Sequence, residues 1–355
     1  MARGFGQGAA AARRVPAARR GGRMFRLDPR AETPKYQQIA QSVVAGLRTG
    51  ALRKGDRLPS INEACKAHGF SRDTVVKAYD LLQEMRYLSA IHGKGYYLRT
   101  DAADPRLRAF VLFDTLNGFK ENVFAGLSDT ISRQADIEVC FHHFNPGLFR
   151  RLLLEARGRY DRYVVMPFPA PEVAQALSDL ETERLLVLDI HACVPNRSTP
   201  FIVQNFDAQL IRALEAGQER LRRYRRFILV FPPDNHDPVE IQDAFLRFGS
   251  RAGLATSIVP RLTEPMVQTE SAYLVLDDRD LVSLVKYCNA TGQRLGRDVG
   301  VLSYNDTPLK EIVAGGISVV SIDFYGLGVR AGQHVLDPRP VHETVPTRLI
   351  LRSSL

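Results

Sequence analysis

The sequence lacks the features that mark membrane proteins, secreted proteins and zinc-ribbon proteins. No apolar run in its 355 residues approaches the roughly 20 residues that a membrane-spanning helix needs, and no apolar segment follows the basic N-terminus as in a secretory signal. The four cysteines (Cys65, Cys140, Cys193 and Cys288) are far apart and form no Cys-x-x-Cys pair, which argues against a disulfide framework or a zinc ribbon. We therefore expect a soluble, cytoplasmic protein with buried thiols.

The usual motifs of catalysis are also missing. The sequence has no Gly-x-Ser-x-Gly, no phosphate loop ending in Gly-Lys-Ser/Thr and no His-Glu-x-x-His, and His142-His143 has no partner at metal-ligand spacing. Gly326-x-Gly328-x-x-Ala331 imitates a dinucleotide-binding fingerprint, but only 24 residues follow Ala331, too few to complete a nucleotide-binding unit. We expect no enzyme activity, no cofactor and no metal.

Charge is distributed unevenly along the chain, whose formal net charge is +9. Residues 1–24 carry six arginines and no acidic residue, a net +6, and residues 25–105 carry 13 basic against 9 acidic residues, a net +4. Residues 106–355 carry 29 basic against 30 acidic residues, a net −1. A polyanionic partner would therefore be bound by the first hundred residues, which favours a nucleic-acid module there.

The first 23 residues are mostly Ala, Gly and Arg and have almost nothing to bury, so we expect residues 1–24 to form a disordered basic tail. Three interpretations stay open: a transit peptide, an arm that binds phosphates, or an upstream extension of a protein whose biological start is Met24. We favour the last, because a regular apolar pattern begins just after Met24.

Three closely spaced helices are predicted within residues 36–85. The first has an apolar face that recurs every three or four residues. Ser60 and Glu63 have the spacing of a capping box, in which each side chain binds a main-chain N–H at the start of the second helix. Gly69 would end this helix, and Ser71 would cap the third one. Two short helices so close together predict a helix-turn-helix.

The next segment, YLSAIHGKGYYLRT, predicts two short strands joined by a turn at Gly93-Lys94-Gly95. This hairpin is the wing of a winged helix-turn-helix, whose third helix enters the major groove of DNA. Arg72 lies in the first turn of that helix, where a guanidinium can bond O6 and N7 of guanine. We predict that Arg72 reads a base.

Further DNA contacts are predicted on the helix caps, the third helix and the wing. Their hydroxyl, cationic or main-chain donors can bind phosphate oxygens, which hold register without reading sequence. These residues are Arg57, Ser60, Ser71, Thr74, Lys77, Gly93 and Lys94. Simpler interpretations remain: Ser60 and Ser71 as caps alone, and Arg57 and Lys77 as solvated surface.

Residues 34–99 resemble the winged helix-turn-helix of GntR-type transcription regulators. The resemblance is carried by PKYQQIA, GDRLPS, SRDTVVKAYDLL and the HGKGYYL wing. It implies DNA contacts at Ser60, Arg72, Thr74 and Gly93. The family often has arginines where this chain has Asn62 and Val76, so the resemblance implies no particular operator sequence.

From residue 106 on, which we term the body, short apolar segments alternate with amphipathic helical ones. The expected strands are AFVLF, IEVCF, YVVMPF, LLVLDI, FILVF, ATSIV, AYLVL, VGVLSY and ISVVSIDF. The expected helices include residues 123–131, 148–156, 239–248 and 281–288. FIVQNF lies between two groups of strands, as a segment crossing between two lobes would. The pattern predicts an α/β fold with parallel sheets in two lobes.

Polar residues follow nearly every expected strand of the body. Ligands of open parallel sheets bind beyond the carboxyl ends of the strands, and in two lobes those ends face one another. Carboxylates and amides bind hydroxyl groups in pairs, and an aromatic ring covers the apolar face of a sugar, so we predict a neutral polyhydroxylated effector. The predicted effector-binding residues are Asp114, Asn117, His142, Phe168, Asp189, Asn205, Asp234, Asp277, Asn305, Asp306 and Asp323.

Simpler interpretations also apply to the body. Asp and Asn are common in turns and helix caps, and Asp207 and Thr307 are expected to cap helices. The basic run RLRRYRR at residues 220–226 is a candidate second nucleic-acid patch, but we favour the end of a helix, where cations oppose the negative end of the dipole.

The C-terminal part of the body also resembles a known family. VGVLSYNDTPLKEIVAGGISVVSIDFYGLGVRAGQHVL and the final VPTRLILRSSL are similar to LacI-type sensor domains, which share the type I periplasmic sugar-binding fold. The resemblance implies that Asn305 and Asp306 lie at a sugar site. The segment before residue 200 matches only in its rhythm of strands and helices.

These patterns predict a winged helix-turn-helix at residues 25–100 and a two-lobed effector-binding and dimerisation domain at residues 106–355. The expected function is a ligand-responsive transcription regulator, a repressor of a sugar-utilisation operon, that binds double-stranded DNA as a homodimer and responds to a sugar or sugar phosphate. One alternative is a GntR-type head fused to a catalytic α/β domain such as an aminotransferase. That domain would need a longer chain and a Schiff-base lysine, and the body contains only Lys120, Lys286 and Lys310.

Overall fold

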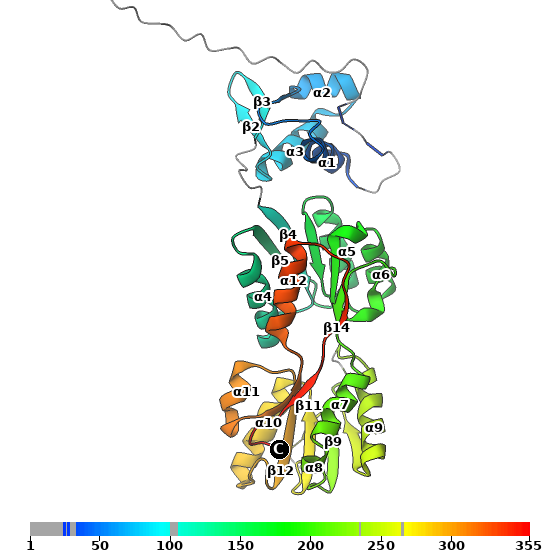
Figure 1. Cartoon of the computed structure of the whole chain (residues 1–355), viewed down its shortest axis with the longest axis vertical. Coiled ribbons are helices and arrows are strands. Elements are labelled where there is room, and N and C mark those ends of the chain that lie inside the picture. The colour runs from blue at the N-terminus through cyan, green and yellow to red at the C-terminus, as the bar shows by residue number, and fades with distance from the viewer. Residues whose placement is uncertain (1–23, 26, 29–32, 100–105, 234–235, 264–265) are drawn as a thin grey trace, which may run out of the picture. The chain divides into compact units, whose positions relative to one another are not determined.

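Local sequence signals specify the winged helix-turn-helix, whose helices and wing strands are labelled in Figure 1. The computed structural model describes residues 24–25, 27–28, 33–99, 106–233, 236–263 and 266–355. In the described part of residues 33–99, which we term the head, the elements are α1 (Lys35–Arg48), β1 (Arg57–Leu58), α2 (Ile61–His68), α3 (Arg72–Glu84), β2 (Leu88–Ile91) and β3 (Gly95–Leu98). Residues 1–23 of the predicted tail (residues 1–24), residues 100–105 and the candidate Asp234 lie outside the described residues.

The predicted helix boundaries of the head are confirmed. Ser60 caps α2 in a capping box, since its side chain accepts from the Glu63 N–H while the Glu63 carboxylate accepts from the Ser60 N–H. Gly69 follows α2 with a left-handed φ of 70°, which suits a residue without a β-carbon. The Ser71 side chain caps α3 by accepting from the Thr74 N–H.

The wing is also confirmed, and it has one strand that the sequence did not reveal. β2 and β3 are antiparallel, with Leu88 opposite Leu98. β1 pairs with the other side of β3, with Arg57 opposite Tyr97. The two residues of β1 lie in a turn-rich segment and show no strand pattern of their own. β1 therefore forms only because it can pair with β3.

The body consists of two six-stranded sheets with helices on both faces. The first lobe contains β4 (Leu107–Phe113), α4 (Gly118–Ile131), β5 (Ala135–Phe141), α5 (Pro146–Ala156), β6 (Arg162–Val165), α6 (Pro171–Ser178), β7 (Leu185–Asp189), β8 (Phe201–Val203), α12 (Phe324–Leu336) and β14 (His342–Thr344). Its strand order is β14-β8-β7-β6-β4-β5, with all pairs parallel.

The second lobe comprises α7 (Ala208–Ala216), α8 (Gln218–Leu221), β9 (Arg226–Val230), α9 (Glu240–Ala252), β10 (Ala255–Val259), β11 (Ser271–Val275), α10 (Asp278–Thr291), β12 (Val299–Tyr304), α11 (Pro308–Ile312), β13 (Ser318–Ser321) and β15 (Arg348–Ile350). Its strand order is β10-β9-β11-β12-β13-β15, and only β15 runs antiparallel to its neighbour. All the strands expected in the body are present. No helix in the described residues is long and apolar enough to span a membrane.

The chain passes between the lobes three times, which the strand rhythm did not predict. FIVQNF is not a crossing segment alone, because Phe201–Val203 is β8 of the first sheet and the crossing follows it. A second crossing follows β13 and leads into α12 of the first lobe, and a third follows β14 and leads into β15. Figure 1 shows this last crossing in red. Residues after 323 therefore complete both lobes.

Gly328 of the apparent dinucleotide fingerprint packs two helices together. A β-carbon on Gly328 of α12 would overlap the carbonyl oxygen of Val123 in α4, and one on Gly126 of α4 would overlap the carbonyl oxygen of Tyr325 in α12. The two helix backbones are therefore in direct contact at these positions. Gly328 thus serves helix packing in the first lobe, whereas Gly326 lies against the Asp323 carboxylate that caps α12.

The basic run at residues 220–226 is also structural. α8 ends within it at Leu221, as expected of a helix end, but Arg226 already begins β9. Arg220 donates to the carbonyl oxygen of the C-terminal Leu355 at 3.0 Å, and Arg225 pairs with Glu270 at 3.0 Å. These arginines bind local partners.

Candidate nucleic-acid interface and effector site

The start of α3 presents the predicted base reader. Arg72 is exposed, and its Nη1 donates to Oδ1 of Asn62 in α2 at 3.2 Å. Asn62 thereby orients the Arg72 side chain. No sequence pattern reveals this pair, since the two residues are ten positions apart and lie on different helices.

The predicted phosphate-binding residues belong to three elements of the head. Ser71 and Thr74 share a hydrogen bond between their hydroxyl oxygens at 2.8 Å, and Lys77 is exposed one turn further along α3. Ser60 is partly buried, and its hydroxyl is used in the capping box. Hydrogen bonds from Ser60 lower the pKa of Glu63, which keeps this cap ionised.

The remaining predicted DNA contacts gather at the wing. The guanidinium of Arg57 packs against Gly95, so that a β-carbon there would lie 3.0 Å from Nε. Gly93 and Lys94 are exposed in the turn, and Gly93 has a φ of 71°. Because β1 pairs with β3, Arg57 lies at the wing together with Lys94.

A buried lysine lies among the strand ends of the first lobe and pairs with two of their aspartates. Lys120 of α4 is only 2% exposed, and its Nζ lies 3.1 Å from Oδ2 of Asp114 and 3.2 Å from Oδ2 of Asp189. Burial lowers the pKa of Lys120, but Asp189 and Asp114 outweigh it, so that the pKa lies above its ordinary value. Gln204, just after β8, donates to Oδ1 of Asp189 at 2.5 Å.

The sequence predicted Asp114 and Asp189 but missed Lys120. A signal was available: residues 120, 123, 127 and 131 repeat at helical spacing, and the last three are the apolar residues of the buried face of α4. Burying a lysine on such an apolar face costs free energy unless carboxylates pair with it. Its partner Asp189 is 69 residues away, however, which no local pattern reveals.

Residues of the two lobes approach one another at these strand ends. The His236 ring of the second lobe stacks on Phe144 of the first with centroids 3.8 Å apart. A β-carbon on Gly118, at the start of α4, would lie 3.2 Å from Cγ2 of Thr307. Burial, followed by the charges of Asp189 and Asp277, raises the pKa of Asp237 to about 6.

His142 and Phe168 form an aromatic support rather than a polar surface. His142 is fully buried and its ring stacks on Phe168 at 5.0 Å. Its Nδ1 accepts from the Phe144 N–H at 3.1 Å, so that Nε2 carries the proton and donates to the Met166 carbonyl oxygen at 2.9 Å. Burial lowers the pKa of His142, which keeps the ring neutral. Both ring nitrogens are therefore occupied by the main chain.

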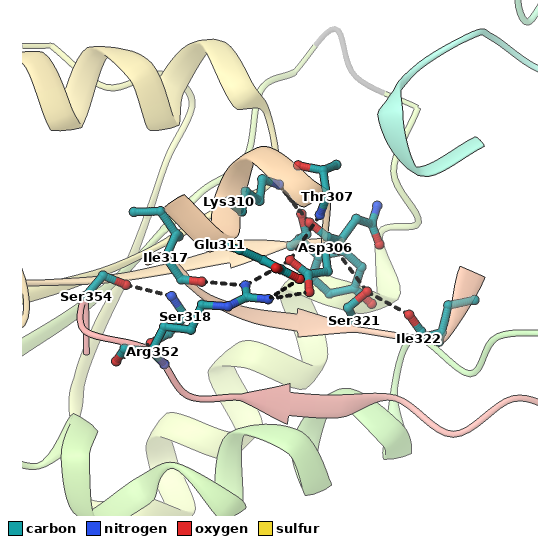
Figure 2. Close-up of polar contacts among 12 residues, drawn as sticks. Asp306, Thr307, Lys310, Glu311, Ile317, Ser318, Ser321, Ile322, Arg352 and Ser354 are labelled. Atoms are coloured by element: carbon teal, nitrogen blue, oxygen red, sulfur yellow. Dashed lines mark hydrogen bonds and ion pairs between the residues drawn. The ribbon is translucent and has the colours of Figure 1, made fainter. Parts of the chain in front are cut away.

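Arg352 holds the second-lobe strand ends in place, as Figure 2 shows. Its Nη1 and Nη2 donate to the two carboxylate oxygens of Asp306 at 2.9 and 2.7 Å, and Nη1 also donates to the Ile317 carbonyl oxygen at 2.9 Å. Asn305 precedes this pair with a φ of 61°, and its Oδ1 is buried without a hydrogen-bond partner in the described residues. Asp306 is thus largely used within the protein, whereas Asn305 keeps an unused acceptor.

The other predicted residues lie at helix starts. Asn117, Asp277 and Asp323 accept from N–H groups in the first turns of α4, α10 and α12. Asn205 accepts from the N–H of Ala208, the first residue of α7. These groups stand at the strand ends as predicted, and their capping bonds occupy one oxygen each.

The two expected caps behave differently from these residues. Asp207 and Thr307 occupy the cap positions of α7 and α11, but neither side chain makes the capping hydrogen bond. Asp207 is instead paired with Arg247. The positions were predicted correctly and the bonds were not, because a cap position does not oblige its side chain to bind the helix.

Comparisons with known proteins support both parts of the chain. Residues 35–98 match the model for bacterial regulatory proteins of the gntR family, and residues 219–355 match that for a periplasmic binding protein-like domain. A LacI family transcriptional regulator from Lactobacillus casei, solved with bound sucrose, has a TM-score of 0.57 over 70% of this chain and 99% of that chain, at 16% identity. The fold therefore defines a winged helix-turn-helix joined to a two-lobed periplasmic-binding-protein-like body.

Curated relatives match the head. Rv1152, an HTH-type transcriptional regulator of Mycobacterium tuberculosis, is 31% identical over 86 residues, which cover 24% of this chain and 71% of Rv1152. YtrA, an HTH-type transcriptional repressor of Bacillus subtilis, is 34% identical over 79 residues, 22% of this chain and 61% of YtrA. The chain thus spans less than two thirds of YtrA. The chain belongs to the gntR family of bacterial regulatory proteins.

Proposed function

We propose that this chain is a transcription repressor whose affinity for its operator changes when a small polyhydroxylated molecule of the sugar class binds between the lobes of the body. Residues 25–100 bind double-stranded DNA, and residues 106–355 bind the effector and form the dimer. The observation that carries the proposal is the exposed guanidinium of Arg72 at the start of α3, held by Asn62, on a chain whose body has the fold of sugar-responsive regulators.

The DNA contacts proposed for the head have two roles, base reading and phosphate binding. Arg72 reads guanine in the major groove, and Lys77 and the Ser71–Thr74 pair bind phosphates beside it. Arg57 and Lys94 reach the backbone from the wing, where Gly93 allows close approach. Ser60 contributes through its helix cap and its position beside the groove.

The effector site comprises strand-end residues of both lobes. Asp114, Asp189, Asp277 and Asn305 supply acceptors for hydroxyl groups, and the Phe168 and His142 rings support the site from the first lobe. The sucrose-bound relative supports a ligand of the sugar class. Closure of the lobes around the ligand would change the geometry of the dimer and so the spacing of the two α3 helices, at a typical coupling of about 1–3 kcal/mol.

Two features support a homodimer: the DNA-binding module of the head and an exposed apolar flank of the body. Paired heads read paired half-sites of a roughly two-fold operator. Large apolar side chains are exposed on α11, where Leu309 is 69% and Ile312 is 73% exposed. Gly118 of α4 lies against Thr307 at the start of α11, and Phe124 of α4 is exposed as well. We propose this flank as the dimer interface.

A catalytic body is disfavoured by the three lysines it contains. Schiff-base chemistry needs a neutral amine. Lys120 is bound by two carboxylates that raise its pKa, and Lys310 donates to the carbonyl oxygens of Tyr304 and Asn305. Lys286 is exposed on α10. We therefore propose a non-enzymatic, cytoplasmic regulator without a cofactor.

Selection of bound fragments from a genomic library, followed by gel shifts with the full chain, tests the proposal. We expect a selective complex that Arg72→Ala converts to weak, salt-sensitive binding, with a loss of about 1–3 kcal/mol in discrimination. Arg86→Gln is the matched control, because Arg86 is an exposed arginine just beyond the other end of α3. No selective complex for the unaltered chain would refute the DNA-binding role.

A further inference from the structure

Arginines gather at the amino ends of the parallel strands of the second lobe. The first residues of β10, β9, β11 and β12 lie level with one another, because Arg226 is opposite Ala255 and Ser271, and Ser271 is opposite Val299. The segments that lead into these strands therefore form one edge of the lobe. Their exposed arginines, which we term the basic edge, are Arg222, Arg223, Arg225, Arg226, Arg251, Arg294 and Arg297.

The basic edge concentrates positive charge on a body that has little. The acidic residues of the same described segments (217–226, 249–254, 266–270 and 292–298) are Glu219, Glu270 and Asp298, so seven arginines minus three acids give a net +4. Arg220 is left out of this sum because it binds Leu355. Residues 106–355 carry a net −1, so the remainder of the body carries −1 minus 4, or −5. This asymmetry is typical of a surface that attracts an anionic partner.

Helix ends explain only part of the basic edge. Arg222 donates from Nε and Nη2 to the carbonyl oxygen of Ala252, the last residue of α9, at 3.4 and 3.3 Å, and Arg251 lies in the last turn of the same helix. Cations at these positions oppose the negative end of the helix dipole. Arg225, Arg226 and Arg297 lie at the starts of strands, where this explanation does not apply.

The contacts of the basic edge hold guanidinium groups in place and leave most of their charge. The carbonyl that binds Arg222 is neutral, and so is the Gln268 amide oxygen that accepts from Nη1 of Arg226 at 2.7 Å. Arg225 pairs with Glu270 at 3.0 Å, but these side chains are 79% and 57% exposed, and ion pairs in solvent are weak. Since a guanidinium has five N–H donors, these groups can still bind another anion.

The chemistry of the basic edge favours a nucleic acid over a protein as its partner. The centre of a protein interface is rich in aromatic and apolar side chains. In the described segments of the basic edge, Met266 is the only large apolar side chain that is exposed. Guanidinium groups bind phosphate oxygens in pairs, and a duplex presents one negative charge per about 1.7 Å of its axis. A chain that binds DNA through its head also holds further duplex at a high local concentration.

We propose that the basic edge is a second DNA-contact surface, which binds the phosphate backbone of double-stranded DNA without reading its bases. Asp277 and Asn305 of the proposed effector site follow the carboxyl ends of β11 and β12, at the opposite end of the same sheet. An effector bound there would leave the basic edge free. The surface adds affinity for any duplex and leaves the choice of operator to Arg72.

Matched triple variants of the full chain test the proposal. The basic-edge variant carries Arg223→Gln, Arg251→Gln and Arg294→Gln, all at exposed positions. The control variant loses the same charge from exposed arginines of the first lobe, through Arg133→Gln, Arg150→Gln and Arg197→Gln. Because the replaced side chains are exposed, both variants should fold, and thermal melting verifies this.

The probe is a duplex of random sequence and about 300 base pairs, twice the persistence length of DNA, so that it can bend back onto the body. Fluorescence titrations between about 0.05 and 0.2 M salt measure its binding. We expect the basic-edge variant to bind about tenfold more weakly than the control at the lower salt concentration. The slope of log affinity against log salt should fall by about 2–3, since each lost phosphate contact removes about 0.9.

The outcomes separate this inference from the proposed function. With a fragment selected from a genomic library, the basic-edge variant should keep its preference over the random duplex, whereas Arg72→Ala should lose it. Equal affinities and slopes for the basic-edge and control variants overturn the second surface and leave the proposed repressor intact. Unchanged DNA binding with a loss of polyglutamate binding also overturns it, and would assign the basic edge to an acidic protein.

Discussion

Each lobe has a buried lysine in the helix that follows one of its strands, and the two lysines are held differently. Lys120 follows β4 and Lys310 follows β12, and they are 2% and 4% exposed. Two carboxylates from separate strand ends hold Lys120. Lys310 is held by two main-chain carbonyls, at 3.1 and 2.7 Å, and by Asp278, whose side chain is 65% exposed.

This difference indicates in which lobe a change of charge would affect ligand binding as well as stability. In the first lobe the lysine sets the charge of the groups that would face the ligand, so a change there alters both stability and binding. In the second lobe Lys310 and Arg352 fasten the turn after β12 and the C-terminal segment. A change there should mainly alter stability.

The largest effect is expected for Lys120→Met. Removing the ammonium group leaves Asp114 and Asp189 buried without a counter-charge, which should lower the free energy of unfolding by about 3–5 kcal/mol. Urea denaturation measures the change. Lys286→Met is the control, because Lys286 is exposed on α10 and should shift stability by less than about 0.5 kcal/mol. A similar small loss for both variants would mean that the ion cluster adds nothing.

A smaller loss is expected for Arg352→Met in the second lobe. The variant loses two charge-assisted bonds to Asp306 in a partly exposed setting, so the free energy of unfolding should fall by about 1.5–3 kcal/mol. Arg348→Met on the neighbouring edge strand is the matched control, since Arg348 is exposed. A loss as large as that of Lys120→Met would erase the contrast between the lobes.

Gly328→Ala tests how α12 completes the first lobe. The added methyl group would overlap the Val123 carbonyl, so α4 and α12 must separate, at a cost of about 1–3 kcal/mol. Gly147→Ala in α5 is the control: its β-carbon would meet only Asn145 at 3.4 Å, and alanine favours a helix. Equal melting temperatures for the two variants would contradict the close packing of α4 and α12.

Asp237→Asn should have the smallest effect, and the opposite sign. Because the folded-state pKa of Asp237 is about 6, above its ordinary value of 3.8, the folded protein binds more protons than the unfolded chain between these values. The unaltered chain therefore loses stability from about pH 4 to about pH 6, and the variant does not. Denaturation across this range should find the two chains alike at the acid end. Above pH 6 the variant should be more stable, by about 1–2 kcal/mol after screening by solvent.

Much of the head could be predicted from its sequence because its signals are local. Ser60 and Glu63 are three residues apart, and Ser71 and Thr74 likewise, so their side chains bind within one helical turn whatever surrounds them. Gly69 suits a left-handed residue by itself. β1 escaped prediction because two residues pair only where β3 is already in place.

The sequence predicted the alternation of strands and helices in the body but not how the chain passes between the two lobes. Alternating strands and helices fix an α/β fold with ligand-facing strand ends, and Asp114, Asp189 and Asn305 lie there. The return of α12 to the first lobe depends on close packing at Gly126 and Gly328, which are 202 residues apart (328 minus 126). No periodic sequence pattern reveals a contact between residues so far apart in the chain.

The sequence by itself determined the helix-turn-helix, the strand rhythm and the basic character of the first hundred residues, because caps, periodicity and charge act over a few positions. Only the tertiary structure decided that Lys120 pairs with two distant aspartates, that Arg352 is bound to Asp306, and that α12 returns to pack on α4. The physical reason is that a buried charge is defined by its partners, and folding brings those partners together from distant parts of the chain.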